Sequence, residues 1–255
     1  MKNPWSFFKE IYVINLEHRE DRRQHIRNHF SRFPGLEYSF FQGVYGMKSR
    51  YLSTYVDKKN IVQFIPDENG IFMSRAQLAC IMSHYMIWQQ ALLRVPEDSP
   101  GYWILIFEDD IEFHPDFSND ILQEYLDSLP SDALMIKMVY QNAEKYSDVK
   151  QVNTHWNKLE KQVFSMMAYA VHTDLLLYLL TNIYKNPLDW YPIHCAYGFI
   201  DICKDGNKTD EFFNYDYIFE NNKQLYKFIG TYNGVGRSFQ KDRDSDINYY
   251  TRHNS

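Results

Sequence analysis

The spacing of apolar and polar positions predicts short strands that alternate with helices. Residues 103–107 form an unbroken apolar run that is too short for a buried helix and is typical of a buried strand. Residues 74–93 carry apolar side chains at steps of three and four, which predicts a helix. Ser74 is a good N-cap for this helix, and Gln77, three residues later, completes a capping box with it. Further predicted strands are residues 11–16, 38–42, 134–139 and 163–171, and further helices are residues 17–32, 116–129 and 174–183.

This order of elements predicts an α/β domain with a mostly parallel central sheet flanked by helices. Ligands of such sheets bind at the carboxyl ends of the strands. Residues 48–70 are polar and rich in turn signals, so we expect a loop there. Residues 230–255 are polar as well, and form either a fraying tail or a segment that closes over a site.

Three consecutive acids, Glu108, Asp109 and Asp110, follow the apolar run directly. In an extended chain Glu108 and Asp110 share one face and Asp109 lies on the other. Two carboxylates on one face repel each other unless a cation lies between them, and hard oxygen ligands suit Mg²⁺ or Mn²⁺. A metal site at the end of this strand is one interpretation, and a solvated acidic turn is the other.

Composition narrows the class of protein. The chain has 255 residues, of which 45% are hydrophobic and 17% aromatic, so it can bury a large core and is not expected to be disordered. The net charge of −6 argues against binding to a nucleic-acid backbone. No apolar run is long enough for a transmembrane segment, and the first ten residues lack the core of a signal peptide.

Cysteine usage indicates the compartment. Cys80, Cys195 and Cys203 are odd in number and match no recognised metal-ligand spacing, so we expect reduced thiols. The sequence therefore predicts a soluble protein that is cytoplasmic or otherwise intracellular.

Three segments resemble glycosyltransferase family 25, which includes lipopolysaccharide and procollagen galactosyltransferases. Residues 12–23 read YVINLEHREDRR and match the family's opening strand and basic helix, and the acidic triplet matches the family's E-D-D. Residues 73–88 read MSRAQLACIMSHYMIW and match its second signature at Cys80, Ser83, His84 and Trp88. There the chain departs from the pattern at Ala76, Gln77 and Ala79, and later it has His194 where relatives often have an aspartate.

The resemblance implies a GT-A-type fold and a metal-dependent, inverting transfer of a hexose from a UDP-sugar, with galactose favoured over glucose. The acceptor it implies is a hydroxyl of a glycan or a collagen-like chain. We expect one domain over residues 1–255, with donor and metal in about residues 1–130. Residues 131–255 would then hold the acceptor, with a C-terminal segment that closes over it.

Individual roles follow from the same resemblance. It implies Mn²⁺ or Mg²⁺ held by Glu108, Asp110 and His194. The donor would be met by Asn15, Arg19, Arg22, Ser74, His84 and Asp109. A solvated helix face is the alternative explanation for the two arginines, and a hydrogen-bonded core position is the alternative for His84.

An inverting transfer needs a general base that takes the proton of the acceptor hydroxyl. The candidates are His194, Asp201 and Asp246, with Asp189 and Asp244 as further acids, and no spacing selects among them. His194 is equally a candidate for the last metal ligand.

Two other functions fit parts of the pattern. The departures at Ala76, Gln77, Ala79 and His194 are also expected of a binding module that has lost catalysis on the same fold. A metal-dependent phosphoryl transferase or nuclease would need a second acidic centre or an activated lysine, and no such motif is evident. Oligomeric state is not encoded in a recognisable motif.

Overall fold

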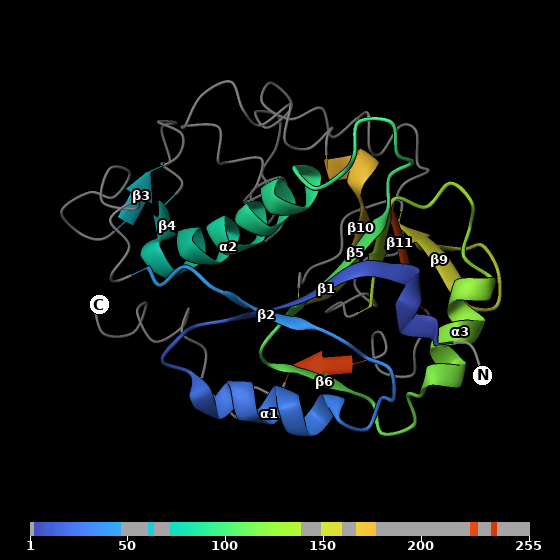
Figure 1. The fold of residues 1–255 in the computed structure, drawn as a ribbon, viewed down its shortest axis with the longest axis horizontal. Helices are drawn as coiled ribbons and strands as arrows, with labels where there is room; N and C mark the ends of the chain where they lie inside the picture. The colour runs from blue at the N-terminus through green and yellow to red at the C-terminus, as the bar shows by residue number, and fades with distance from the viewer. Residues whose placement is uncertain are drawn as a thin grey trace.

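The computed structural model describes residues 3–46, 61–63, 72–138, 149–159, 167–176, 225–228 and 236–238. Its centre is an eight-stranded sheet with the strand order β2-β1-β5-β10-β7-β11-β9-β8 (Figure 1). These strands are β1 Phe8–Asn15, β2 Ser39–Gln42, β5 Trp103–Glu108, β7 Met135–Lys137, β8 Val149–Gln151, β9 Trp156–Leu159, β10 Ala168–His172 and β11 Leu225–Phe228.

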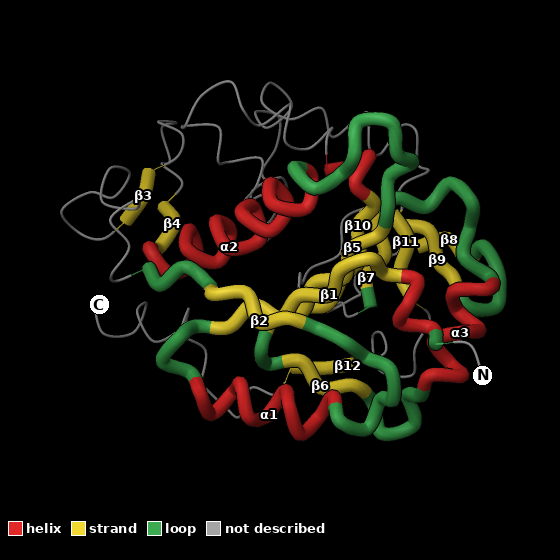
Figure 2. The backbone as a smooth tube through the Cα atoms, in the orientation of Figure 1, coloured by secondary structure: helices red, strands yellow, loops and turns green. Residues whose placement is uncertain are grey.

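Two strand pairs lie outside this sheet. They are β3 Ile61–Gln63 with β4 Phe72–Ser74, and β6 Ile111–Phe113 with β12 Gly236–Ser238. The helices are η1 Pro4–Phe7, α1 Glu20–Phe30, α2 Arg75–Leu92 and α3 Asn119–Asp127 (Figure 2). Residues 173–176 also begin a helix, so the predicted start of that helix is confirmed.

The α/β class is confirmed, but the sheet is mixed rather than mostly parallel. β1 runs parallel to β2 and to β5, and β11 runs parallel to β7. The other four pairings are antiparallel. They join β10 to β5 and to β7, β9 to β11, and β8 to β9. Apolar periodicity locates a strand but does not encode its direction, which depends on how the chain returns to the sheet.

Short strands in polar stretches were not predicted. β3 lies in the segment expected to be a loop, and β8 and β9 lie in the polar segment that precedes β10. Each has only three or four residues, which is too few to show an alternating pattern. Their backbone pairing, rather than an apolar face, defines them.

The two faces of β5 are covered by different helices. Leu105 and Phe107 belong to a core that includes Ile26 and Phe30 of α1. Figure 1 shows α2 on the opposite face of the sheet. Because successive side chains of a strand point to opposite faces, Glu108 follows the even-numbered positions to the α2 side.

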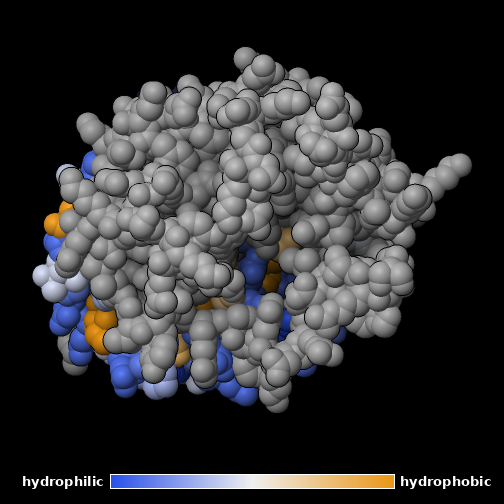
Figure 3. Space-filling view, turned by 180° about the vertical axis from the view of Figure 1, so that it is seen from behind, coloured by the Kyte–Doolittle hydropathy of each residue, from blue (hydrophilic) through white to orange (hydrophobic). Residues whose placement is uncertain are grey.

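The described surface carries few large apolar side chains. Seen from behind, its coloured part is mostly hydrophilic with small apolar patches (Figure 3). The large hydrophobic residues that are exposed are Phe7, Met86, Leu93 and Val152. Among the described helices, none combines the length and the apolar character that crossing a bilayer requires.

Phe113 is the centre of an aromatic cluster on the α1 side. Its side chain is buried, and its ring centroid lies 4.8–6.2 Å from those of six other rings. These rings belong to Trp5, His29, Phe30, Phe33, Phe107 and Phe117. The cluster therefore joins η1, α1, β5 and the segment that leads to α3.

We predict that Phe113→Ala lowers the free energy of unfolding by about 3–5 kcal/mol, because it leaves a cavity among rings that cannot all collapse into it. Urea denaturation would measure the change. Leu93→Ala is the control: this side chain is 87% exposed, and we expect a change of about 0.5 kcal/mol or less. Equal effects of the two substitutions would contradict the central position of Phe113.

Candidate functional site

The polar residues predicted from the sequence lie where β1 and β5 end side by side. The two strands are parallel, and Ile14 pairs with Glu108 in their register. Asn15 is the last residue of β1, and Asp109 and Asp110 form the turn that follows β5. β1 and β5 thus bring Asn15 and the acidic triplet to one edge of the sheet.

Asp109 lies on the α1 side of this edge, and both of its carboxylate oxygens are bound. Oδ1 accepts a hydrogen bond of 2.8 Å from Nη1 of Arg22, and Oδ2 accepts one of 2.7 Å from Nδ2 of Asn15. Burial raises the pKa of Asp109, although the charge and hydrogen bond of Arg22 and the hydrogen bond from Asn15 oppose the rise. The carboxylate is therefore costly to bury and depends on these two partners.

Arg22 does not lie on a solvated helix face, so that alternative is wrong for this residue. Its side chain is 10% exposed and forms an ion pair with Asp109. Burial lowers the pKa of its guanidinium, but Asp109 and then Asp110 raise it, and the net shift is upward. The side chain of Arg19 is just as little exposed, at 11%, but its partner Asp21 has a side chain that is 64% exposed.

Asn15 connects three parts of the site. Besides its bond to Asp109, Nδ2 donates to the backbone oxygen of Arg19 at 3.1 Å. Its Oδ1 accepts a hydrogen bond of 2.8 Å from Nε of Arg23. Asn15 is 1% exposed, so it holds the start of α1 against the turn after β5.

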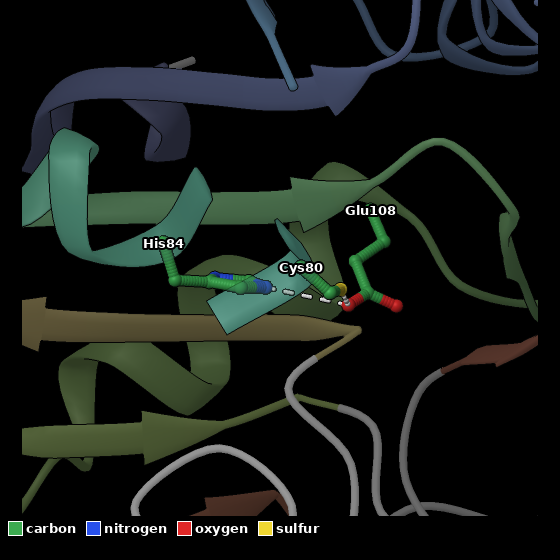
Figure 4. Close-up of side chains that lie close together, drawn as sticks. All are labelled: Cys80, His84 and Glu108. Carbon is green, nitrogen blue, oxygen red and sulfur yellow. Dashed lines mark hydrogen bonds and ion pairs between the residues drawn. The ribbon is translucent and has the colours of Figure 1, made fainter. Parts of the chain in front are cut away.

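Glu108 lies on the α2 side and meets two side chains of that helix (Figure 4). Its Oε1 lies 3.3 Å from Nε2 of His84 and 3.6 Å from Sγ of Cys80. The other nitrogen of His84, Nδ1, lies 3.0 Å from the hydroxyl oxygen of Tyr169, which accepts a hydrogen bond of 2.8 Å from the indole of Trp88. His84 is buried and hydrogen-bonded, as its core alternative predicted, and it also contacts the acidic triplet.

The prediction that the side chains of Glu108 and Asp109 point to opposite faces of the strand agrees with these contacts. The strand ends at Glu108, however, so the alternation that placed Asp110 with Glu108 does not extend to Asp110, which lies in the turn. The side chain of Glu108 is 21% exposed, whereas Asp110 is only 4% exposed. The pairing of these two carboxylates around an ion stays a prediction.

Lys137 is a residue near this site that the sequence analysis did not single out. It lies in β7 and is 4% exposed. Burial lowers its pKa to about 7, while the negative charge of Glu108 acts in the opposite direction. The signal in the sequence that could have identified it is that Lys137 is the one charged residue in the apolar segment 134–139.

The C-terminal part of the chain reaches the same edge. β12 pairs antiparallel with β6, and Ser238 lies opposite Ile111, the residue that follows the turn. At these three residues the segment 230–255 is part of a strand pair rather than a fraying tail. The hypothesis that it closes over the site concerns residues beyond this pair.

The structure does not describe several of the predicted site residues. His194, Asp201 and Asp246, with Asp189 and Asp244, lie outside the described residues. Ser74 ends β4, and α2 begins at the next residue, as the predicted helix start requires.

The prediction of reduced thiols is confirmed for Cys80, which is a free cysteine. Cys80 and His84 are one turn apart on α2, and with Glu108 they offer three ligand atoms within 4.8 Å of one another. The spacing C-x₃-H on a helix was the available signal. It was not recognised because the third residue of the group, Glu108, lies 24 residues after His84 at the end of a strand.

Comparisons with known proteins identify the family of the chain. A family profile described as "Glycosyltransferase family 25 (LPS biosynthesis protein)" matches residues 8–194. A "Glycosyltransferase 25 family member" of Aedes aegypti is 34% identical over 117 residues, which are 44% of this chain and 18% of that protein.

Two further relatives carry more specific names. The "Lipooligosaccharide biosynthesis protein lic2B" of Haemophilus influenzae is 36% identical over 100 residues, 39% of this chain and 33% of that protein. The "Procollagen galactosyltransferase 1-A" of Xenopus laevis is 30% identical over 137 residues, 52% of this chain and 21% of that protein. The chain thus spans a third or less of the length of these three relatives.

We predict that Arg22→Met lowers the free energy of unfolding at neutral pH by about 3–5 kcal/mol, because it leaves the buried Asp109 carboxylate without its cation. A carboxyl whose pKa is raised in the folded state destabilises that state above this pKa. The cost disappears below the unfolded pKa. The destabilisation should therefore shrink as the pH falls into the acidic range, in denaturation curves recorded across pH.

Arg27→Met, on the same helix, is the matched control. Arg27 pairs with Glu20, but their side chains are 47% and 64% exposed, so we expect a loss of about 1 kcal/mol or less. A loss from Arg22→Met that does not change with pH would contradict the role given to Asp109.

Proposed function

The chain belongs to glycosyltransferase family 25, and we propose that it is a metal-dependent inverting glycosyltransferase. It would move a hexose from a UDP-sugar to a hydroxyl of a glycan or collagen-like acceptor. The observation that carries the proposal is the edge where β1 and β5 end, which gathers Asn15 and residues 108–110. In α/β sheets this is the edge at which ligands bind.

The donor set suits a hard divalent cation. Glu108 and Asp110 provide carboxylate oxygens within three residues, which favours Mg²⁺ or Mn²⁺. Glu108 and Asp110 would hold the ion together with His194. When bound, the ion supplies Lewis-acid stabilisation of the negative charge that develops on the leaving diphosphate.

The residues on the α1 side would position the site and bind the donor. Asn15 and Arg22 hold Asp109 and thereby fix the turn that carries Asp110. Arg19 donates two hydrogen bonds to the carboxylate of Asp21, whose side chain is exposed, and a donor phosphate would take the place of this carboxylate. His84 would orient Glu108 from the α2 side, and Ser74 completes the proposed donor contacts.

The names of relatives guide the choice of sugar and acceptor. The relative from Xenopus laevis is named a galactosyltransferase, so UDP-galactose is the first donor to test and UDP-glucose the second. A lipooligosaccharide biosynthesis protein and a procollagen-modifying protein are both among the relatives. The acceptor panel should therefore hold a bacterial glycan and a collagen-like peptide.

We predict that Asp110→Asn lowers the metal-dependent rate of UDP release by about 100-fold or more. A metal contributes several kcal/mol of transition-state stabilisation, and each 1.36 kcal/mol is about tenfold in rate. UDP release would be measured with Mn²⁺, after chelation, and after Mn²⁺ is restored. Asp98→Asn is the control, because Asp98 is exposed in the turn before β5 and should keep the wild-type rate.

Release of UDP by Asp110→Asn at the wild-type rate would refute the metal assignment. A wild-type chain that binds the UDP-sugar but releases no UDP with either donor or acceptor would be a binding module instead. The two results are separated by measuring binding and turnover on the same preparation.

We predict that one of His194→Ala, Asp201→Asn and Asp246→Asn loses transfer by about 10²–10⁴-fold while its affinity for Mn²⁺ stays the same. Loss of a general base costs this much in rate without affecting the metal. If His194 is a metal ligand, its variant will instead bind Mn²⁺ more weakly. Transfer rates and Mn²⁺ titrations of the three variants distinguish the outcomes, and full activity in all three would exclude these residues.

A further inference from the structure

We propose that Cys80, His84 and Glu108 form a binding site for a zinc ion, with Sγ, Nε2 and Oε1 as the protein ligands. The three atoms lie within 4.8 Å of one another, and the residues converge from α2 and the end of β5 (Figure 4). This site lies on the α2 side of the acidic triplet. It shares Glu108 with the Mn²⁺ or Mg²⁺ site proposed above, whereas its sulfur and nitrogen ligands, Cys80 and His84, belong to the zinc site alone.

Both separations from Oε1 of Glu108 to the other two ligand atoms fit tetrahedral zinc. Zinc binds imidazole at about 2.0–2.1 Å, carboxylate at about 2.0–2.2 Å and thiolate at about 2.3 Å, at angles near about 109°. These values place nitrogen and oxygen about 3.3–3.5 Å apart and sulfur and oxygen about 3.5–3.7 Å apart. The observed distances from Oε1 are 3.3 Å to Nε2 and 3.6 Å to Sγ.

The supporting contacts also fit. A histidine that binds a metal usually donates its other ring N–H to a polar group, which fixes the orientation of the ring. Nδ1 of His84 faces the hydroxyl oxygen of Tyr169 at 3.0 Å, and Trp88 anchors that hydroxyl. With the ring proton on Nδ1, Nε2 presents its lone pair toward Glu108 and Cys80.

The charges and chemical character of the ligands select zinc over the harder cations. Binding would release the proton of the Cys80 thiol, so that a thiolate and a carboxylate balance the two charges of the ion. A set of sulfur, nitrogen and oxygen ligands favours zinc, whereas Mg²⁺ and Mn²⁺ prefer oxygen. His84 is fully buried, while Cys80 and Glu108 are partly exposed, which leaves an approach from one side.

Three protein ligands leave a fourth position for water or another ligand, as in open zinc sites. The second carboxylate oxygen of Glu108 points away from Cys80 and His84 (Figure 4). The proposal does not depend on the transferase activity, because it concerns binding of the ion alone.

The test is zinc titration of the full chain against a chromophoric chelator, in excess Mg²⁺ and without nucleotide sugar. We expect one zinc ion per chain for the wild type and for Cys195→Ser, which removes a different thiol. Cys80→Ser and Glu108→Gln should weaken zinc binding by more than about 100-fold, because each removes a ligand. Tyr169→Phe removes only the supporting contact and should weaken it by about 10–100-fold.

Substitution with Co²⁺ gives a second readout. The wild type should show thiolate-to-cobalt charge-transfer absorption in the near ultraviolet, and Cys80→Ser should not. Far-ultraviolet circular dichroism and thermal unfolding would establish that each variant is folded. The proposal is overturned if the folded wild type binds no zinc, or if folded Cys80→Ser binds zinc and Co²⁺ as the wild type does.

Discussion

The carboxylate of Asp109 is buried at the end of a central strand, and its charge must be compensated inside the protein. Arg22 supplies the opposite charge from α1, and Asn15 supplies a hydrogen bond from β1. Removal of Arg22 would leave a buried charge without its cation, and removal of Asn15 would leave one carboxylate oxygen without its hydrogen bond. The first strand, the first helix and the turn after β5 are therefore held in one arrangement by a single carboxylate.

This constraint determines what the neighbouring acids can do. Asp109 is bound on the α1 side, so Glu108 is directed to α2, where it meets His84 and Cys80. Asp110 follows in the turn, at a position that the Arg22–Asp109 pair and β6 fix from both sides. The acidic triplet is thus three residues with three environments rather than one uniform cluster of charge.

The packing around the site keeps these environments apart. The rings around Phe113 fill the α1 side, and the hydrogen-bonded group of Trp88, Tyr169 and His84 occupies the α2 side. Lys137 places a further ionisable group in the interior near Glu108, where burial favours its neutral form. Ionisable groups whose pKa values are shifted by burial and by a neighbouring charge are typical of functional sites.

The sequence alone determined the elements with a strong apolar pattern, the acidic triplet and the family. β1, β5, α1, α2 and α3 were predicted within a few residues. The strands, α2 and α3 follow from apolar runs and helical spacing, whereas α1 was predicted as a charged helix with few apolar residues. The match of residues 12–23, 73–88 and 108–110 to family patterns also needed no structure. These features are local, and each can be recognised in one segment of chain.

Only the tertiary structure decided the direction of β10, the pairing of β12 with β6 and the partners of each acid. Asp109 finds its cation 87 residues earlier in the chain, and Glu108 meets Cys80 28 residues earlier. Such contacts depend on how strands and helices pack, and no local spacing encodes them. The burial of Lys137 and Arg22 could not be predicted from the sequence either. The free energy of a charged group depends on what surrounds it in three dimensions.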